Sequence, residues 1–176
     1  PETVFINHDT EFGRDVVIHP NVVFGQNVII ESSVEIKSFS HLEKCKIKSG
    51  SIIGPFARIR ENSVIGKNSK IGNFVEIKKS KLSEDVKVNH LSYVGDSEIG
   101  SSTNIGAGTI TCNYDGKHKQ KTKIGKNSFV GSNSTIIAPI KIGENVTMGA
   151  GSTFDKDIPD NTLSIGRAYQ INKKKK

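Results

Sequence analysis

Tryptophan is absent from this sequence of 176 residues, which has only one methionine, three tyrosines and two cysteines. Cys45 and Cys112 make no CxxC pattern, so a disulfide framework is excluded and reduced thiols are expected. No apolar run approaches the roughly 20 residues that a membrane-spanning helix needs. No basic and then apolar leader opens the chain, which gives no indication of secretion. We therefore expect a cytoplasmic protein that does not enter a membrane.

The chain has the length of one domain with room for a substantial core. Its first residue is Pro1 rather than a methionine, which indicates a piece of a longer protein. We divide it into one domain over 1–168 and a basic tail over 169–176.

Positive charge is concentrated at the end of the chain. The net charge is +7, and Lys173–Lys176 contribute four of these charges, without which the net charge is +3. A short terminal lysine run is typical of a solvated tail. Three tyrosines and no tryptophan leave little aromatic surface for stacking bases. The remaining charge favours an anionic small substrate over nucleic acid.

A repeat of six residues runs through most of the chain. An Ile, Val, Leu, Phe or Met recurs at every sixth position from Phe12 to Phe154, with short interruptions, in 24 hexads. This period does not fit an amphipathic helix, whose apolar positions recur at 3, 4 and 7. It predicts an all-β fold, a parallel β-helix in which each hexad forms one side of a triangular prism. Three sides per coil give about 8 coils, and prisms of this kind wind left-handed, against the usual crossover rule.

Two further positions of the hexad are informative. The small residue at the fifth position is expected to point inward, where the sides meet at a crowded edge. This position holds Ala57, Ser63, Ser69, Val75, Thr103, Thr109, Ser128, Ser134, Val146 and Ser152. Glycine at the second position is expected to give a tight corner with backbone angles that other residues resist. These glycines are Gly66, Gly72, Gly100, Gly106, Gly125, Gly131, Gly143 and Gly149.

The clearest break in the repeat is the segment 113–123, NYDGKHKQKTK. Asp115 and Gly116 form a turn signal, and most of the segment is polar or charged. A polar loop that leaves an otherwise regular prism is typical of a functional segment, and a tolerated surface insertion is the alternative.

Polar residues on neighbouring coils predict a second functional feature. With about 18 residues per coil, Arg60, Lys78 and a point near residue 95 fall on the same side of adjacent turns. His90 and Tyr93 flank this region, so the spacing predicts two cations, an imidazole and a phenol in one patch. Such a patch suits a phosphorylated or carboxylated ligand with one titratable group beside it. Ordinary solvated side chains are the alternative.

Five segments carry longer motifs: GPFARIRENSVIG (54–66), IGNFVEIKKSKL (71–82), HLSYVGDSEIG (90–100), NIGAGTITCNYDGKHKQKT (104–122) and FVGSNSTIIAPIKIG (129–143). Together they resemble the C-terminal acetyltransferase domain of the GlmU family, the bifunctional bacterial N-acetylglucosamine-1-phosphate uridyltransferases and glucosamine-1-phosphate acetyltransferases. The resemblance covers residues from about 50 to 168. The run NIGAGTITCNYDG is long enough to separate this family from other hexapeptide acyltransferases.

This resemblance implies acetyl transfer from acetyl-CoA to the amine of glucosamine 1-phosphate, a step toward UDP-N-acetylglucosamine for peptidoglycan and lipopolysaccharide. It implies that His90 is the general base, that the protein is a homotrimer with sites between prisms, and that this domain needs no metal. Mg²⁺ is implied only for an N-terminal uridyltransferase domain, which the chain lacks. The residues implied to hold the substrate are Arg60, Lys78, Tyr93, Asn104 and Lys119. Those implied to bind acetyl-CoA are Ala107, Asn113, Tyr114, Ser132, Ala150 and Arg167.

The chemistry expected of such a site is general-base catalysis. A sugar amine is partly protonated at neutral pH, and a neutral imidazole accepts its proton as the nitrogen attacks the thioester, which is typically worth about 10²- to 10⁴-fold. A backbone N–H near Ala107 is the candidate donor to the oxyanion. Acylation of Cys112 is the covalent alternative. Glu76 either holds the substrate amine or orients His90, and the sequence does not choose between these roles.

Other functions are less consistent with the sequence. The NYDG loop disfavours a hexapeptide acyltransferase for a serine, an amino acid or a different sugar. A γ-type carbonic anhydrase needs three histidines converging on zinc, and only His90 lies in the patch, so no metal site is expected. An ice-binding scaffold needs ranks of outward threonines, whereas these outward positions mix Lys, Asn, Glu and Ser. A nucleic-acid binder would show steeply salt-dependent binding.

Overall fold

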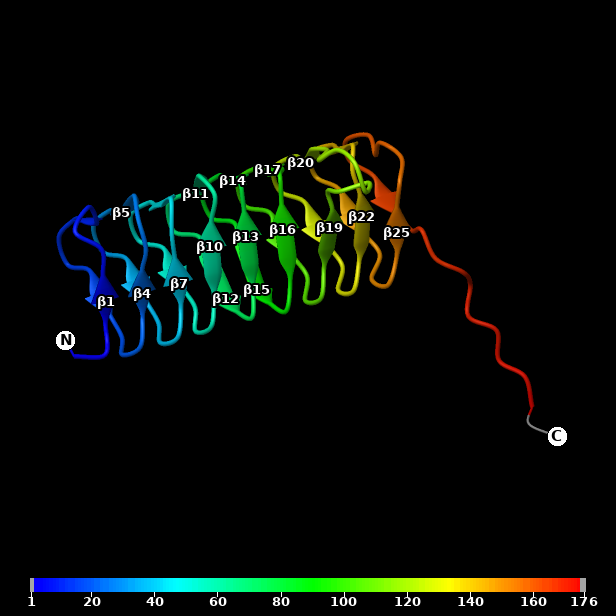
Figure 1. The fold of residues 1–176 in the computed structure, drawn as a ribbon. Helices are drawn as coiled ribbons and strands as arrows, with labels where there is room; N and C mark the ends of the chain where they lie inside the picture. Colours follow the sequence, from blue (N-terminus) through cyan, green and yellow to red (C-terminus); the bar gives the residue numbers. More distant parts are fainter. Residues whose placement is uncertain (1, 175–176) are drawn as a thin grey trace.

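The computed structural model describes residues 2–174, in which every regular element is a short β-strand. The strands form three parallel sheets, here called A, B and C, which are the three sides of a long prism (Figure 1). Up to β25, each strand pairs with the strand three places away in the sequence, so each coil contributes one strand to each side; the last strand, β26, pairs with β24 because the last coil has no strand in sheet B. No helix that could span a membrane occurs over 2–174. Residues 175–176 of the expected basic tail lie outside the described residues.

The strands of each sheet follow one another in spatial order. Sheet A contains β1 (Phe5–Ile6), β4 (Val23–Phe24), β7 (His41–Leu42), β10 (Arg58–Arg60), β13 (Glu76–Lys78), β16 (Tyr93–Gly95), β19 (Ile110–Cys112), β22 (Thr135–Ile137) and β25 (Thr153–Phe154). Sheet B contains β2 (Glu11–Phe12), β5 (Val28–Ile30), β8 (Cys45–Ile47), β11 (Ser63–Ile65), β14 (Lys81–Leu82), β17 (Ser97–Ile99), β20 (Thr122–Ile124) and β23 (Ile140–Ile142). Sheet C contains β3 (Val17–Ile18), β6 (Glu35–Ile36), β9 (Ile52–Ile53), β12 (Lys70–Asn73), β15 (Lys87–His90), β18 (Asn104–Ile105), β21 (Phe129–Val130), β24 (Thr147–Met148) and β26 (Leu163–Ser164).

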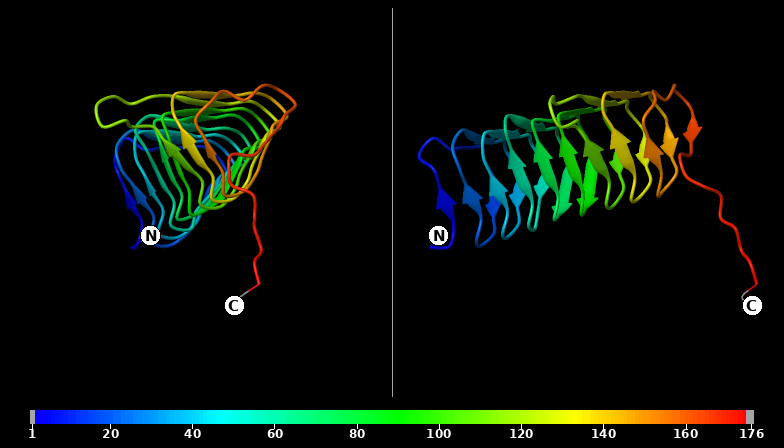
Figure 2. Two further views of the ribbon diagram at one scale, coloured as in Figure 1. Left: turned by 90° about the vertical axis from the view of Figure 1, so that its right-hand side faces the viewer. Right: turned by 45° about the vertical axis from the view of Figure 1, so that its right-hand side comes forward.

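The coils wind left-handed, as the hexad repeat predicts. In Figure 1 the strands of sheet A run upward at the front, sheet B follows along the top and sheet C returns behind, while the chain advances from left to right. The end view in Figure 2 shows the triangular outline. Nine strands in sheets A and C make nine coils rather than the eight expected. The difference arises because β1 precedes the first hexad counted, at Phe12, and β26 follows the last, at Phe154.

The interior is a continuous stack of aliphatic side chains. Ile59, Ile77 and Val94 are direct partners on adjacent strands of sheet A, and all three are fully buried. All ten small residues predicted at the fifth position are also buried, each 2% exposed or less. Hydroxyls at this position donate to backbone carbonyls, as Ser63 Oγ does to the carbonyl of Arg60 over 2.6 Å; the buried Ser152 Oγ, which has no partner among the described residues, is an exception.

Glycine occupies the second position of the hexad for a different reason from the one expected. None of the eight has a positive φ; the left-handed conformation lies instead at the fourth position, for example at Asn68 (φ 55°). A Cβ on Gly66 would lie 2.1 Å from the carbonyl oxygen of Ser83, and one on Gly72 would lie 2.0 Å from that of Asn89. Glycine is therefore favoured at Gly66 and Gly72 because the backbone of the next coil approaches too closely for a Cβ.

Exchange of Gly66 for alanine is expected to destabilise the prism. The added methyl group meets backbone of the next coil, and overpacking of this kind typically costs about 1–3 kcal/mol. Gly149→Ala is the matched control, since its Cβ would first meet the Cγ1 atom of the exposed Ile165 side chain at 3.1 Å. Urea midpoints for the two variants should show a clear loss for Gly66→Ala only, and equal midpoints would contradict the steric explanation.

Candidate active site

The first cluster of polar residues lies at the edge where sheet A turns into sheet B, here called the A–B edge. Arg60, Lys78 and Gly95 end three adjacent strands, β10, β13 and β16, and are direct partners in the ladder. The coil spacing predicted this register. The structure therefore brings the two cations of the expected patch side by side.

Acidic side chains pair with both cations. Arg60 Nε donates to Glu76 Oε1 over 2.6 Å, and its Nη1 pairs with Glu61. Lys78 Nζ lies 3.6 Å from Glu61 Oε2 and 3.8 Å from Asp96 Oδ2, and Lys78 is only 5% exposed. Burial opposes the charge on Arg60, but its bonds to Glu76 and Glu61 raise the pKa of the guanidinium above its ordinary value. The cations are thus already neutralised by the chain itself.

Tyr93 lies over the same sheet. It begins β16 and is the ladder partner of Glu76, and a Cβ on Gly95 would lie 2.5 Å from the Tyr93 hydroxyl. The absence of a side chain at Gly95 therefore makes room for the phenol. Burial raises the pKa of Tyr93, and the nearby charge of Glu76 raises it further. The hydroxyl stays protonated at neutral pH and is available as a hydrogen-bond donor.

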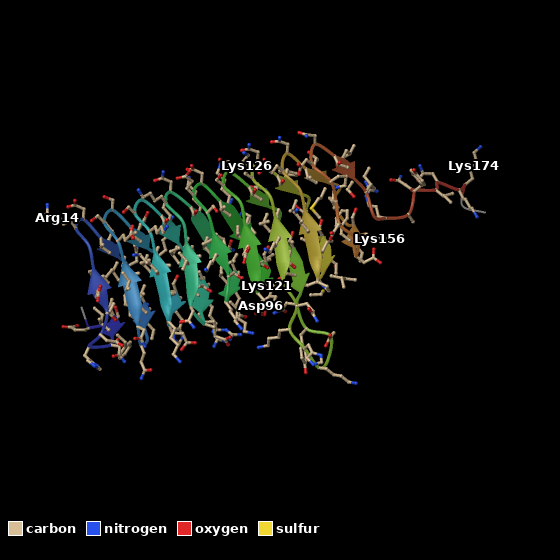
Figure 3. The ribbon with its side chains drawn as sticks, turned by 90° about the horizontal axis from the view of Figure 1, so that it is seen from above. Arg14, Asp96, Lys121, Lys126, Lys156 and Lys174 are labelled. Atoms are coloured by element: carbon tan, nitrogen blue, oxygen red, sulfur yellow. The ribbon has the colours of Figure 1, made fainter. Side chains whose placement is uncertain are left out.

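Asp96 connects this cluster to the loop. It is 8% exposed, and its Oδ2 accepts a hydrogen bond from Asn113 Nδ2. It also pairs with Lys78 and with Lys79, each over 3.8 Å. Figure 3 labels Asp96 and Lys121 where the loop leaves the prism. One buried carboxylate thus contacts Lys78, expected to bind substrate, and Asn113, expected to bind acetyl-CoA. Asp96 is not among the residues predicted from the sequence, although it directly follows the predicted position near 95.

The loop over 113–123 is closed on itself. Asp115 Oδ1 accepts two backbone N–H groups further along the turn, which confirms the predicted Asp115–Gly116 turn and lowers the pKa of that carboxyl. Tyr114 and Lys119 form an antiparallel bridge across the loop. Both side chains are exposed, and the end view in Figure 2 shows the loop projecting from the A–B edge.

His90 belongs to a different edge, where sheet C turns into sheet A, here called the C–A edge. It ends β15, and its Nδ1 lies 2.8 Å from Oδ1 of Asn73, its ladder partner on β12. Asn104 is the ladder partner of Lys87, which lies three residues before His90 on β15. Glu76 is bonded to Arg60 instead. Within the part of the chain that the structure describes, His90 therefore does not join the hydrogen-bonded cluster of Arg60, contrary to the single patch expected, and Asn73 is its partner.

Four of the residues expected to bind acetyl-CoA follow His90 along the C–A edge. Backbone hydrogen bonds connect the coils there: Gly108 N–H donates to His90 O over 3.2 Å and Asn133 N–H to Ala107 O over 2.7 Å. On the next coil, Gly151 N–H donates to Ser132 O over 2.8 Å. A Cβ on Gly151 would lie 3.9 Å from Arg167 Cδ. The residues in this row are Ala107, Ser132, Ala150 and Arg167.

The two thiols lie apart from His90. Cys45 is buried in sheet B, where loss of solvation raises its pKa to about 12, so it is an unreactive thiol. Cys112 ends β19 directly before the loop and is half-buried. No group of three or more His, Cys, Asp or Glu side chains suited to a metal ion occurs between residues 2 and 174.

Comparisons with known proteins agree with this architecture. The model of the family described as bacterial transferase hexapeptide (six repeats) matches residues 44–79 and 121–156. LpxA from Acinetobacter baumannii superposes with a TM-score of 0.84 at 20% identity, covering 95% of this chain and 70% of that one; at this identity the likeness shows the fold alone. The segments 44–79 and 121–156 are thus similar to hexapeptide repeats of bacterial transferases.

Curated relatives that match almost the whole chain include bifunctional GlmU proteins. Those of Anaplasma marginale (strain Florida) and Zymomonas mobilis are each 54% identical to this chain over 173 residues, which is 98% of its length. The chain spans about two-fifths of the length of these relatives, 40% and 38% respectively. The sequence similarity therefore extends to coils that the motif resemblance did not cover.

Asp96→Asn is expected to lower stability far more than Glu98→Gln. Each carboxylate contacts two lysines, but Asp96 and its partner Lys78 are buried, whereas Glu98 and its partners are exposed. Breaking a buried pair typically costs about 3–5 kcal/mol, and an exposed one about 0–1 kcal/mol. Thermal unfolding of both variants beside the parent chain measures this difference, and equal midpoints would show that Asp96 is not structurally required.

Proposed function

We propose that this chain transfers an acetyl group from acetyl-CoA to the amine of glucosamine 1-phosphate. It would do so in the cytoplasm, as the acetyltransferase part of a longer protein that makes a precursor of peptidoglycan and lipopolysaccharide. The names of the GlmU relatives support the activity. The observation that carries the proposal is the exposed imidazole of His90, held through one nitrogen at the start of a row of small residues.

In this proposal His90 is the general base and Asn73 fixes its tautomer. The amide oxygen of Asn73 can only accept a hydrogen bond, so His90 Nδ1 carries the hydrogen and Nε2 keeps its lone pair. Nε2 then takes the proton of the sugar amine as the nitrogen attacks the thioester carbon. Attack is direct in this scheme, because Cys45 is buried in sheet B and Cys112 lies at the A–B edge, whereas His90 lies at the C–A edge.

In this proposal the phosphate of the substrate binds at the A–B edge and acetyl-CoA binds at the C–A edge. Arg60, Lys78 and the loop residue Lys119 would hold the phosphate, while the Tyr93 hydroxyl and Asn104 would bind the sugar. Acetyl-CoA would lie along the C–A edge, where small side chains allow close approach to the backbone. The residues proposed to contact it are Ala107, Asn113, Tyr114, Ser132, Ala150 and Arg167, with the Ala107 N–H as the oxyanion donor. No step in this scheme uses a metal.

A homotrimer would bring the two edges together. Because the base lies at the C–A edge and the cations at the A–B edge, a complete site requires the A–B edge of one prism beside the C–A edge of another. Exposed aromatic rings support such a contact: Phe39, Phe56 and Phe74 are stacked along the C–A edge, with centroids 4.9 and 5.0 Å apart. Leu91 extends this row beside His90 and is 63% exposed. An apolar row of this kind is typical of a protein interface.

His90→Ala is expected to lower kcat about 100-fold or more while acetyl-CoA binding stays nearly unchanged, since only the base is lost. Thiol release from acetyl-CoA measures this, with glucosamine 1-phosphate and glucosamine 6-phosphate as separate acceptors and His41→Ala as the control. Release with the 1-phosphate alone, lost only in His90→Ala, is the predicted result. Full activity of His90→Ala would show that His90 is not the general base. Thiol release with neither acceptor would show that glucosamine 1-phosphate is not the substrate.

Asn73→Asp is expected to shift the acid limb of the kcat–pH profile to higher pH. A carboxylate at this position stabilises the protonated imidazole, so the free base forms only at higher pH. Asn73→Ala should lower kcat without that shift. Nitrogen-15 NMR of the His90 ring reports the tautomer directly, and an unchanged tautomer in Asn73→Ala would show that Asn73 does not set it.

A further inference from the structure

The carboxylate of Glu61 lies over the two cations to which the substrate's phosphate is assigned. One oxygen, Oε1, pairs with Arg60 Nη1, and the other, Oε2, is 3.6 Å from Lys78 Nζ. The side chain of Lys78 is 6% exposed, whereas that of Glu61 is 42% exposed. Glu61 is thus the more exposed of the two acidic partners of Lys78, because the other partner of Lys78, Asp96, is buried. A ligand from solvent meets Glu61 before it reaches the ammonium group.

The corner that carries Glu61 is longer than its neighbours. Six positions separate the inward residues Ile59 and Ile65, whereas five separate those of the coils on either side. The shorter corners are Leu42–Ile47, Ile77–Leu82 and Val94–Ile99. Both Glu61 and Asn62 have a positive φ, of 54° and 61°, whereas a single residue does so at the next corner, Lys79. The extra residue lengthens the turn at this corner. From this turn, the side chain of Glu61 reaches Lys78 on the next coil.

The other acidic groups have different roles. Glu76 Oε1 bonds Arg60 Nε over 2.6 Å from the partner strand, and Asp96 is buried against Asn113. Both are fixed in the ladder or in the interior. Glu61 lies on a turn, and its bonds in the described structure are the two ion pairs to Arg60 and Lys78. It can therefore leave both cations without disturbing a strand.

We propose that Glu61 is an internal competitor that occupies the phosphate position on Arg60 and Lys78 until the substrate's phosphate displaces it. This inference rests on the phosphate site of the proposed function. A carboxylate with two oxygens on two cations presents the same acceptors as two phosphate oxygens. Because the competitor is tethered, it weakens the binding of every anion at this position, so only an anion with further contacts, such as those to the sugar, binds well. Glu61 is in this sense a specificity-determining residue.

The test compares Glu61→Gln, Glu61→Asp and Glu31→Gln with the parent chain. Glu31 is a matched control, since it pairs with Lys46 over 3.1 Å and follows β5, two coils before the coil of Arg60. In Glu61→Gln, the KM for glucosamine 1-phosphate and the calorimetric Kd for inorganic phosphate, at fixed ionic strength, should both fall about threefold or more with kcat unchanged. Glu61→Asp keeps the charge on a side chain one methylene shorter, so its KM and Kd should lie between those of the parent chain and Glu61→Gln. Glu31→Gln should change neither constant.

Arg60→Ala separates failure of this inference from failure of the phosphate site. If Arg60→Ala weakens phosphate binding but Glu61→Gln leaves it unchanged, the cations bind phosphate and Glu61 does not compete, which overturns the inference alone. If Glu61→Gln raises the KM, Glu61 aligns the cations instead of competing, which also overturns it. If neither variant changes the KM or the Kd for phosphate, the phosphate site itself is wrong.

Discussion

The close stacking of one coil on the next is the constraint on which the rest of this protein depends. Backbone N–H groups of each coil donate to carbonyls of the adjacent one along all three sheets, and inward isoleucine and valine side chains fill the space between. The approach is close enough that glycines such as Gly66 and Gly72 have no room for a Cβ. Sequence freedom is consequently confined to outward positions and corners.

The residues of the proposed site lie at the corners of the prism. The strands of sheet A are two or three residues long, so a side chain at either end belongs to an edge. His90 and the row that includes Ala107 share the C–A edge, whereas Arg60 and Lys78 share the A–B edge with the loop. Division of the proposed site between two edges of one rigid prism explains why a second copy of the chain would be needed to complete it.

Electrostatic balance shapes the A–B edge. Arg60 and Lys78 have acidic partners in the chain itself, and Lys78 is nearly inaccessible. The partners differ in their setting: Glu76 is in a strand, Asp96 is buried and Glu61 is on an exposed turn. When a phosphate binds at this edge, Arg60 and Lys78 would exchange a carboxylate for the phosphate. The net affinity would then depend on which carboxylate is displaced.

The sequence by itself determined the fold, because a strict period of six permits only a prism with an apolar residue inside at every hexad. It also predicted the register of Arg60, Lys78 and residue 95, since these lie 18 and 17 residues apart, about one coil each. Only the tertiary structure decided what their side chains contact. The partnership of His90 with Asn73, the pairing of Glu76 with Arg60 and the bridging position of Glu61 depend on which edge each coil presents and on corners that are one residue longer or shorter. The repeat period constrains the inward residues but leaves the outward contacts at each corner to local geometry.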